Sequence, residues 1–261
     1  MGNRPGLITR AVVIYKNDGF VVLLRSILIR LRMEYILLPF AMMIVRFKKT
    51  RNIDDLIDFC FSLTGGLIRP LQIRSEIKTL MEIIGERRPE IILEIGTFNG
   101  GTLFLFSRVV SKAATMISVD FPDVRFGGGY DWWKNSLFKA FRLRGQSLTL
   151  IRADSHKAET LNEVIKVLRG RKIDFLFIDG DHSYQGVKQD FEMYCPLVGI
   201  NALIAFHDIV VHPPETGCEV SIFWKGLNPE GFIKKEIIDD DKQVQCGIGI
   251  LERNGLMADN E

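Results

Sequence analysis

Acidic side chains recur at the ends of five short apolar segments of the sequence. They are Glu94, Asp120, Asp154, Asp179 and the Asp208 that follows His207. Ligands of open α/β sheets bind beyond the carboxyl ends of the strands, so these positions are the first candidates for a site. About one residue in ten is acidic in ordinary proteins, and five acids in comparable places exceed that chance rate. The spacing predicts a ligand-binding edge.

The segment IILEIGTFNGG at residues 91–101 is the most distinctive of the five. It predicts a buried strand that enters a tight turn and then a helix. Gly96 and Gly100 would let the backbone approach a ligand, and the helix start would offer free N–H groups to a carboxylate or phosphate. Asp120 is placed to accept two hydrogen bonds from a ribose diol. The G-x-G-x-x-G of dinucleotide sites is absent, and a purely structural turn is the alternative.

Apolar runs and helical spacing alternate along the chain from residue 73 onward. Short apolar runs bounded by polar turns predict buried parallel strands at 91–95, 115–119, 148–151, 173–178 and 202–206. Helical spacing predicts helices over 73–84, 161–168, 187–194 and 221–225. Two further apolar segments, 232–238 and 244–251, predict an antiparallel hairpin at one edge. The alternation implies βαβ units and a sheet covered by helices on both faces.

The composition is that of a folded globular protein, with 261 residues, 47% of them hydrophobic and 25% charged. The four cysteines, Cys60, Cys195, Cys218 and Cys246, are widely spaced without a CxxC pair. That spacing indicates neither a disulfide framework nor a zinc site, and it suits thiols in a reducing cytoplasm.

The N-terminal segment differs from the rest in charge. Residues 1–50 carry nine Lys or Arg and two acids, whereas the whole chain has a net charge of +2. Arginines within the apolar stretch 19–45 argue against a membrane span, because each costs roughly 2.5–3.5 kcal/mol near the bilayer centre. Two interpretations remain: peripheral contact of residues 19–50 with the inner membrane face, or a helical cap on the main domain or a second subunit. We predict a helical extension at 1–70 and a main domain at 71–261, with no nucleic-acid partner.

Several motifs together resemble a known enzyme family. E-x-G-x-x-x-G at 94–100 resembles motif I of the class I S-adenosylmethionine-dependent methyltransferases. In order and spacing, SVDFPDVRFGGGYDWWK, LIRADSH, FIDGDHSY and AFHD are similar to the cephalosporin-hydroxylase-like and macrolide-sugar O-methyltransferases, the methyltransferase family 24 type. The resemblance covers roughly residues 72–252. It implies an α/β, Rossmann-like seven-stranded sheet with helices on both faces.

The resemblance also implies roles for particular residues. Cofactor contacts would come from Glu94, Gly96, Thr97, Asn99, Gly100, Asp120 at the ribose, Asp154 and Ser155 beside the adenine, and Asp179. Catechol-type relatives bind Mg²⁺ at the ends of the fourth and fifth strands, which here are Asp179, His207 and Asp208. The alternative is that Asp208 caps a turn and His207 is a hydrogen-bonded core residue.

His182 lies three positions after Asp179, where catechol-type relatives place a lysine that deprotonates the acceptor hydroxyl. An imidazole with an ordinary pKa of about 6.5 suits general-base work near neutral pH. The alternative role is a hydrogen bond at the start of the next helix. Two loops are candidates for acceptor contacts: FGGGYDWW at 126–133, with Tyr130, Trp132 and Trp133 as walls, and HPPETGC at 212–218.

These inferences predict methyl transfer from S-adenosylmethionine to an oxygen of a small molecule or glycan, with Mg²⁺ as an optional aid. A homo-oligomer in the cytoplasm or on the inner membrane face is the predicted setting. Two rivals remain: a hydroxylase or oxidoreductase on the same sheet, and a catalytically silent binding or scaffold protein.

Overall fold

The computed structural model describes residues 37–63, 66–122, 129–240 and 242–253. By its contacts the chain divides into two compact units, residues 1–47 and 48–261. In the described part the helical segments are α2 (Leu38–Phe47), α3 (Ile53–Asp58), the π-helical η2 (Phe59–Leu63), α4 (Arg74–Arg87), α5 (Gly101–Val109), α6 (Lys134–Lys139), α7 (Ala158–Leu168), α8 (Tyr184–Tyr194), the short 3₁₀ turns η3 (Cys195–Leu197) and η4 (Pro214–Thr216), and α9 (Val220–Gly226).

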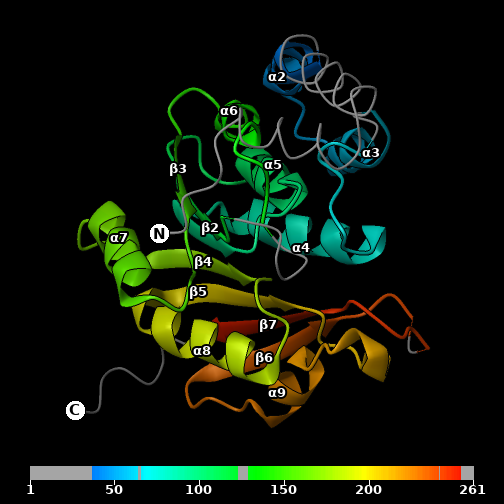
Figure 1. The fold of residues 1–261 in the computed structure, drawn as a ribbon, viewed down its shortest axis with the longest axis vertical. Coiled ribbons are helices and arrows are strands. Elements are labelled where there is room, and N and C mark those ends of the chain that lie inside the picture. The colour runs from blue at the N-terminus through cyan, green and yellow to red at the C-terminus, as the bar shows by residue number, and fades with distance from the viewer. Residues whose placement is uncertain (1–36, 64–65, 123–128, 241, 254–261) are drawn as a thin grey trace, which may run out of the picture. The chain divides into compact units, whose positions relative to one another are not determined.

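The strands form one seven-stranded sheet in the order β3-β2-β1-β4-β5-β7-β6. Their bounds are β1 (Ile91–Ile95), β2 (Thr115–Asp120), β3 (Ser147–Arg152), β4 (Ile173–Ile178), β5 (Val198–His207), β6 (Phe232–Ile237) and β7 (Ile248–Arg253). β1 to β5 pair in parallel, and β7 pairs antiparallel with both β5 and β6. Figure 1 shows α4 and α5 on one face, and α7, α8 and α9 on the other. The predicted Rossmann-like sheet and its edge hairpin are confirmed.

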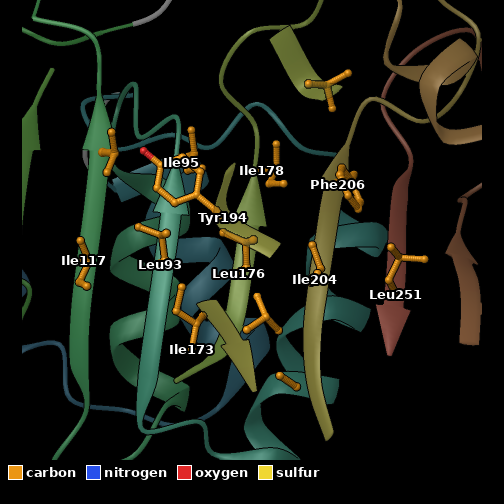
Figure 2. Packing of buried hydrophobic residues seen from close by; sticks show 14 of the residues in the cluster. Leu93, Ile95, Ile117, Ile173, Leu176, Ile178, Tyr194, Ile204, Phe206 and Leu251 are labelled. Atoms are coloured by element: carbon orange, nitrogen blue, oxygen red, sulfur yellow. The ribbon is translucent and has the colours of Figure 1, made fainter. Parts of the chain in front are cut away.

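The central strands are buried because helices cover both faces. Every residue of β1 and β2 is buried, including the acids Glu94 and Asp120. Apolar side chains of β1, β4 and β5 pack together with Tyr194 of α8, as Figure 2 shows for Leu93, Leu176 and Ile204. Continuous apolar runs suit strands that are buried on both faces. β3 and β6, in contrast, are partly exposed.

Two strand boundaries differ from those that the sequence predicts. β5 begins at Val198, four residues before the predicted start, and includes the exposed Ile200 and Asn201. β7 begins at Ile248 instead of residue 244, because Cys246 and Gly247 both have positive φ, 66° and 82°. Backbone in the left-handed region does not continue a strand, so the turn ends just before Ile248.

The first unit contains one described helix, α2, while residues 1–36 lie outside the described part. Within the described residues, none of the helices combines the length and apolar character that crossing a membrane requires. The membrane-contact segment 19–50 falls largely outside the described residues. The division at residue 70 remains a prediction about domains; residues 48–70 belong to the same compact unit as the sheet.

Candidate functional site

The turn between β1 and α5 is shaped by its glycines. Gly96 has a φ of 89°, and a Cβ added there would lie 1.9 Å from the backbone oxygen of Asp179. Gly100 has a φ of 80°, and a Cβ there would lie 2.4 Å from the Phe138 ring. Both glycines are therefore needed for contacts within the protein, whatever they do for a ligand. The contact of Gly96 with Asp179 brings the β1 turn against the end of β4.

Asp120, the last residue of β2, is bonded to the backbone on both carboxylate oxygens. Its Oδ2 accepts hydrogen bonds from the N–H groups of Thr97 (3.1 Å) and Phe98 (2.7 Å). Its Oδ1 accepts from Phe121 (2.7 Å) and Gly129 (3.1 Å). A carboxylate has about four lone-pair sites, so these four donors occupy them. A ribose diol would bind Asp120 only by replacing one or more of these backbone donors.

Glu94 is fully buried in the middle of this edge. The Thr102 hydroxyl donates to its Oε1, while its Oε2 has no hydrogen-bond partner among the described residues. Burial raises the pKa of Glu94 to about 8, despite hydrogen bonds from Thr102 and Thr97 that lower it. Glu94 therefore offers an unpartnered oxygen to a donor or cation that approaches the turn.

Asn99 contacts Lys134, a residue that the sequence analysis did not identify. The Lys134 ammonium, at the start of α6, donates to Asn99 Oδ1 at 2.7 Å. Burial lowers the pKa of Lys134, with opposing contributions from Asp131 and Asp120. A lysine that folds back from α6 onto the turn has no local sequence signal, because the pairing spans 35 residues.

Asp154 and Ser155 follow β3 and form hydrogen bonds with other residues of the protein. The Oδ1 of Asp154 accepts from the His156 N–H at 2.9 Å, and its backbone oxygen accepts from the Thr160 hydroxyl. The Ser155 backbone oxygen accepts from Tyr194 at 2.8 Å. These bonds fix the loop between β3 and α7, where the adenine is expected.

The ends of β4 and β5 bring histidines and carboxylates together. His207 Nδ1 lies 3.1 Å from Asp179 Oδ1 and 3.2 Å from Asp208 Oδ1. His182 lies on the solvent side, with Nδ1 3.2 Å from Asp208 Oδ2 and Nε2 3.5 Å from Asp179 Oδ1. His212 Nε2 lies 3.2 Å from Asp208 Oδ1. We call these five residues the histidine cluster.

A family model matches the part of the chain that holds most of this site. Residues 93–209 match a family model described as a methyltransferase domain. The match covers less than half of the chain, and it makes these residues similar to that family.

Solved structures of methyltransferases share the fold of this chain. The O-methyltransferase TomG from Streptomyces achromogenes, in complex with SAM, has a TM-score of 0.54 at 15% identity, covering 80% of this chain and 92% of that one. An O-methyltransferase from Bacillus cereus, in complex with SAH, has a TM-score of 0.51 at 15% identity, covering 79% and 93%. At this identity the likeness establishes the class I methyltransferase fold.

A sequence relative, an uncharacterised protein of Acanthamoeba polyphaga mimivirus, is 35% identical over 44% of this chain and 50% of its own length. This chain spans half or less of the length of the curated relatives that it matches.

Charge coupling sets the protonation of the histidine cluster. Burial acts to raise the pKa of Asp179, but the His207 charge and hydrogen bonds from both histidines hold it below its ordinary value. Burial acts to lower the pKa of His207, and the two carboxylates raise it well above the ordinary value. For His182, burial lowers the pKa, but Asp179, Cys218 and Asp208 raise it to about 11. These contacts favour the protonated form of His182 at neutral pH.

A protonated imidazole has no free lone pair, so the general-base role of His182 requires that it first lose a proton. That role stays a prediction. The alternative, a hydrogen bond at the helix start, is filled by another residue: the Ser183 side chain caps α8 by accepting from the Gly186 N–H at 3.0 Å. The His182 side chain is 43% exposed and faces the carboxylates.

The donor set fits Mg²⁺ poorly. Mg²⁺ requires hard oxygen ligands in near-octahedral geometry, usually carboxylates and waters. Here the Nδ1 of His207 lies between the carboxylates of Asp179 and Asp208, and His182 contacts both. Of the predicted metal ligands Asp179, His207 and Asp208, only the two carboxylates offer the hard oxygen atoms that Mg²⁺ prefers, and histidine nitrogens contact both of them.

Other residues at this edge carried no local signal in the sequence. Gln72 donates to Asp179 Oδ2 at 2.8 Å from a segment 107 residues away. Side-chain ligand atoms of Cys218 and Cys246 lie within 4.8 Å of histidine-cluster atoms, in the sets His182–Asp208–Cys218 and His207–Asp208–Cys246. Only the fold joins these segments, although His212 and Cys218 do lie in the predicted HPPETGC loop.

The described part of the FGGGYDWW loop gives its aromatics different positions. Tyr130 is buried against Phe138, with ring centroids 4.7 Å apart, and its hydroxyl has no described partner. Trp132 is 49% exposed, and the Trp133 indole donates to Asp131. Residues 126–128 lie outside the described part. Tyr130 is thus a core residue, and Trp132 is the aromatic that faces solvent.

Proposed function

We propose that this chain transfers a methyl group from S-adenosylmethionine to a hydroxyl oxygen of a small molecule or glycan. The observation that carries the proposal is the contact of Gly96 with Asp179, which puts the turn of the methyltransferase domain directly against the histidine cluster. A cofactor on the turn and an acceptor at the cluster would then be neighbours. TomG and the Bacillus cereus O-methyltransferase, which share the fold, are in complex with SAM and SAH.

The residues of the turn fit such a cofactor. Glu94 keeps one buried oxygen without a described partner, and a cationic amino group beside it would favour the ionised carboxylate that burial otherwise disfavours. Lys134 supplies a positive charge next to Asn99, which suits a carboxylate. Asp120, Asp154 and Ser155 are the proposed contacts of the ribose and adenine, with Gly96, Thr97, Gly100 and Asp179 beside the methionine part.

The cofactor, when bound, supplies an electrophilic methyl group on a sulfonium. Methyl transfer is a direct displacement, so the chain must align the acceptor oxygen, exclude water and remove one proton. His182 is the exposed member of the histidine cluster and is placed to meet an acceptor hydroxyl. Asp179 and Asp208 hold its two ring nitrogens and so fix its orientation.

Calorimetric titration with S-adenosylmethionine and S-adenosylhomocysteine tests the cofactor half of the proposal. We expect micromolar binding to the purified chain, weakened in an Asp154→Ala variant whose melting temperature is checked beside it. NAD⁺ serves as the control ligand for the oxidoreductase alternative, and we expect it not to bind. Tight NAD⁺ binding without S-adenosylmethionine binding would overturn the proposal.

Transfer of labelled methyl to a panel of small-molecule and glycan hydroxyls tests the acceptor half. A methyl ether is stable to base. Label that base releases from the product would therefore exclude a methyl group on a hydroxyl oxygen. Binding of the cofactor with no transfer to any acceptor would favour the scaffold alternative.

For the N-terminal segment we propose peripheral contact with anionic lipid. In α2, Phe40, Met43 and Phe47 are 56%, 47% and 75% exposed, and Arg46 lies in the last turn. Exposed apolar residues beside basic ones suit an interfacial helix. Co-sedimentation with anionic vesicles, lost in a Phe40→Ser, Phe47→Ser double variant, is the expected result; equal binding to neutral vesicles would contradict it.

A further inference from the structure

The histidine cluster borders a set of donors that suits a different metal from magnesium. His182, Asp208 and Cys218 each offer a ligand atom, and these atoms lie within 4.8 Å of one another. Imidazole, carboxylate and thiolate together are the ligand types of zinc and related divalent transition metals. We propose that His182 Nδ1, Asp208 Oδ2 and Cys218 Sγ form a binding site for a zinc-like divalent transition metal.

The spacing of the first two donors agrees with tetrahedral coordination. His182 Nδ1 and Asp208 Oδ2 are 3.2 Å apart. Two ligands at about 2.0–2.2 Å from one zinc ion, at a tetrahedral angle, are separated by roughly 3.3–3.5 Å. A simple ion pair between His182 and Asp208 would have a similar separation. The thiol of Cys218 favours a metal site, because an ion pair needs no third ligand atom.

The second polar atoms of the His182 and Asp208 side chains contact neighbouring residues. The other oxygen of Asp208, Oδ1, lies 3.2 Å from both His207 Nδ1 and His212 Nε2, which leaves Oδ2 for the metal. The other nitrogen of His182, Nε2, lies 3.5 Å from Asp179 Oδ1. Metal-binding histidines commonly contact a carboxylate through the second ring nitrogen, which orients the ring.

The backbone brings Cys218 to the same place. The N–H of Glu219 donates to the His182 oxygen at 2.8 Å, and the N–H of Tyr184 donates to Glu219 Oε2 at 3.0 Å. Two hydrogen bonds thus tie the segment after Cys218 to the segment of His182. Asp208 has a φ of 65°, in the left-handed region that non-glycine residues seldom adopt. Such backbone strain is typical of functional sites.

One coordination position of this site would face solvent. The His182 side chain is 43% exposed, and Cys218 is partly exposed. Three protein ligands with an open fourth position are the pattern of catalytic zinc sites, where water or a substrate oxygen completes the coordination. This inference does not depend on methyl transfer, because metal binding can be measured without S-adenosylmethionine.

Cobalt substitution tests the site on the tag-free, chelator-treated full-length chain. We expect one equivalent of Co²⁺ to bind with thiolate-to-cobalt charge-transfer absorption and tetrahedral d–d bands, and Zn²⁺ to displace it. A millimolar excess of Mg²⁺ should not displace the Co²⁺. Absence of the charge-transfer band, or displacement of Co²⁺ by Mg²⁺, would overturn the proposal.

Cysteine variants locate the metal. Cys218→Ser should remove the charge-transfer band and weaken binding by more than the roughly 10- to 100-fold typical for loss of an outer partner, while Asp179→Asn should fall within that range. Cys195→Ser is the matched control, because Cys195 lies at the far end of α8, about 16 Å along the helix, and the band should persist. Loss of the band in Cys246→Ser but not in Cys218→Ser would place the metal at the buried His207–Asp208–Cys246 set and overturn this assignment. Thermal melting of each variant shows that it is folded.

Discussion

Asp120 and Asp208 lie at the ends of neighbouring halves of one sheet, yet the protein surrounds them with different partners. Asp120 accepts four hydrogen bonds from backbone N–H groups. Asp208 faces three imidazoles, those of His182, His207 and His212. Backbone donors neither titrate nor bind metals, whereas imidazoles do both.

The difference separates a fixed region from an exchangeable one. The turn around Asp120 is held by the chain's own backbone N–H groups. Protons in the histidine cluster can leave, and a divalent cation can replace them. One edge of the sheet thus combines a carboxylate held by backbone donors with a carboxylate held by groups that titrate.

The largest expected effect is at the point where the two regions touch. Gly96→Ala would place a Cβ 1.9 Å from the Asp179 backbone oxygen, at a φ of 89°. Left-handed backbone costs about 1–2 kcal/mol for an L-residue and overpacking about 1–3 kcal/mol more, so we expect a loss above ~3 kcal/mol. Urea unfolding measures it.

Gly170→Ala is the matched control for backbone conformation. Gly170 has a φ of 80° and nothing within 4 Å of an added Cβ, so only the cost of about 1–2 kcal/mol from the backbone should appear. Equal losses for the two variants would mean that the close contact of the turn with β4 is not what constrains Gly96.

A second prediction compares the two carboxylates directly. Asp120→Asn turns an amide NH₂ toward two backbone donors, and each buried N–H left unsatisfied costs about 1–3 kcal/mol, so we expect a loss of at least about 2 kcal/mol. Asp208→Asn in chelator-treated protein should cost about 1 kcal/mol, because Asp179 still pairs with His182 and His207, and an imidazole that loses its proton can accept from the amide. Denaturant unfolding of both variants decides; a larger loss for Asp208→Asn would reverse the comparison.

Much of the fold could be predicted from local patterns. Continuous apolar runs such as Ile91–Ile95 and Ile173–Ile178 coincide with buried parallel strands. The polar ends of these runs correctly marked the edge at which Asp120, Asp179 and Asp208 lie. Local patterns failed where the boundary depends on backbone conformation, as at Cys246 and Gly247 before β7.

The candidate site was less accessible to sequence reasoning. Widely spaced cysteines argued against a zinc site, because spacing rules describe ligands that are close in sequence. His182, Asp208 and Cys218 come from three loops and meet only through the fold. The role of Gly96 was equally hidden, since the atom that requires it belongs to Asp179, 83 residues away.

A further acid–histidine pair lies outside both regions and should make the stability of the fold depend on pH. His156 Nε2 lies 3.2 Å from Oδ1 of Asp190, a fully buried carboxylate. The nearby Asp190 carboxylate raises the pKa of His156, against burial, which lowers it, and the same Nε2 lies 3.2 Å from the Gly186 oxygen. A raised folded-state pKa means stabilisation that is complete below the unfolded value of about 6.5 and is lost as pH rises through the folded value.

His156→Ala should therefore cost more at low pH than at high pH. We expect a loss of about 1.5–3 kcal/mol near pH 6, the range for a hydrogen bond to a charged group, and a smaller one near pH 9. His156→Gln keeps an amide donor for Asp190 without titrating, so its stability relative to His156→Ala should not change in that way. A cost of His156→Ala that is constant with pH would show that the imidazole is neutral throughout.

The smallest effect on folding is expected at Lys134, which joins α6 to the turn. Its ammonium donates to Asn99 Oδ1 at 2.7 Å, and burial lowers its pKa. Replacing a partly buried charge with an apolar side chain of similar length is often close to neutral for stability, so Lys134→Met should change unfolding by less than ~1 kcal/mol. Lys139→Met, on the exposed side of the same helix, is the control.

The same variant has a larger consequence for cofactor binding. If the turn holds the carboxylate of S-adenosylmethionine, the ammonium of Lys134 is the cation beside it, and its loss should weaken binding about 10-fold, or about 1.4 kcal/mol. The weakening should shrink as salt screens the charge, while Lys139→Met should bind as the unaltered chain does. Equal affinity of Lys134→Met and the unaltered chain at low salt would leave the backbone N–H groups of the α5 start as the carboxylate's donors, and the fixed region would then bind its ligand without any side-chain charge.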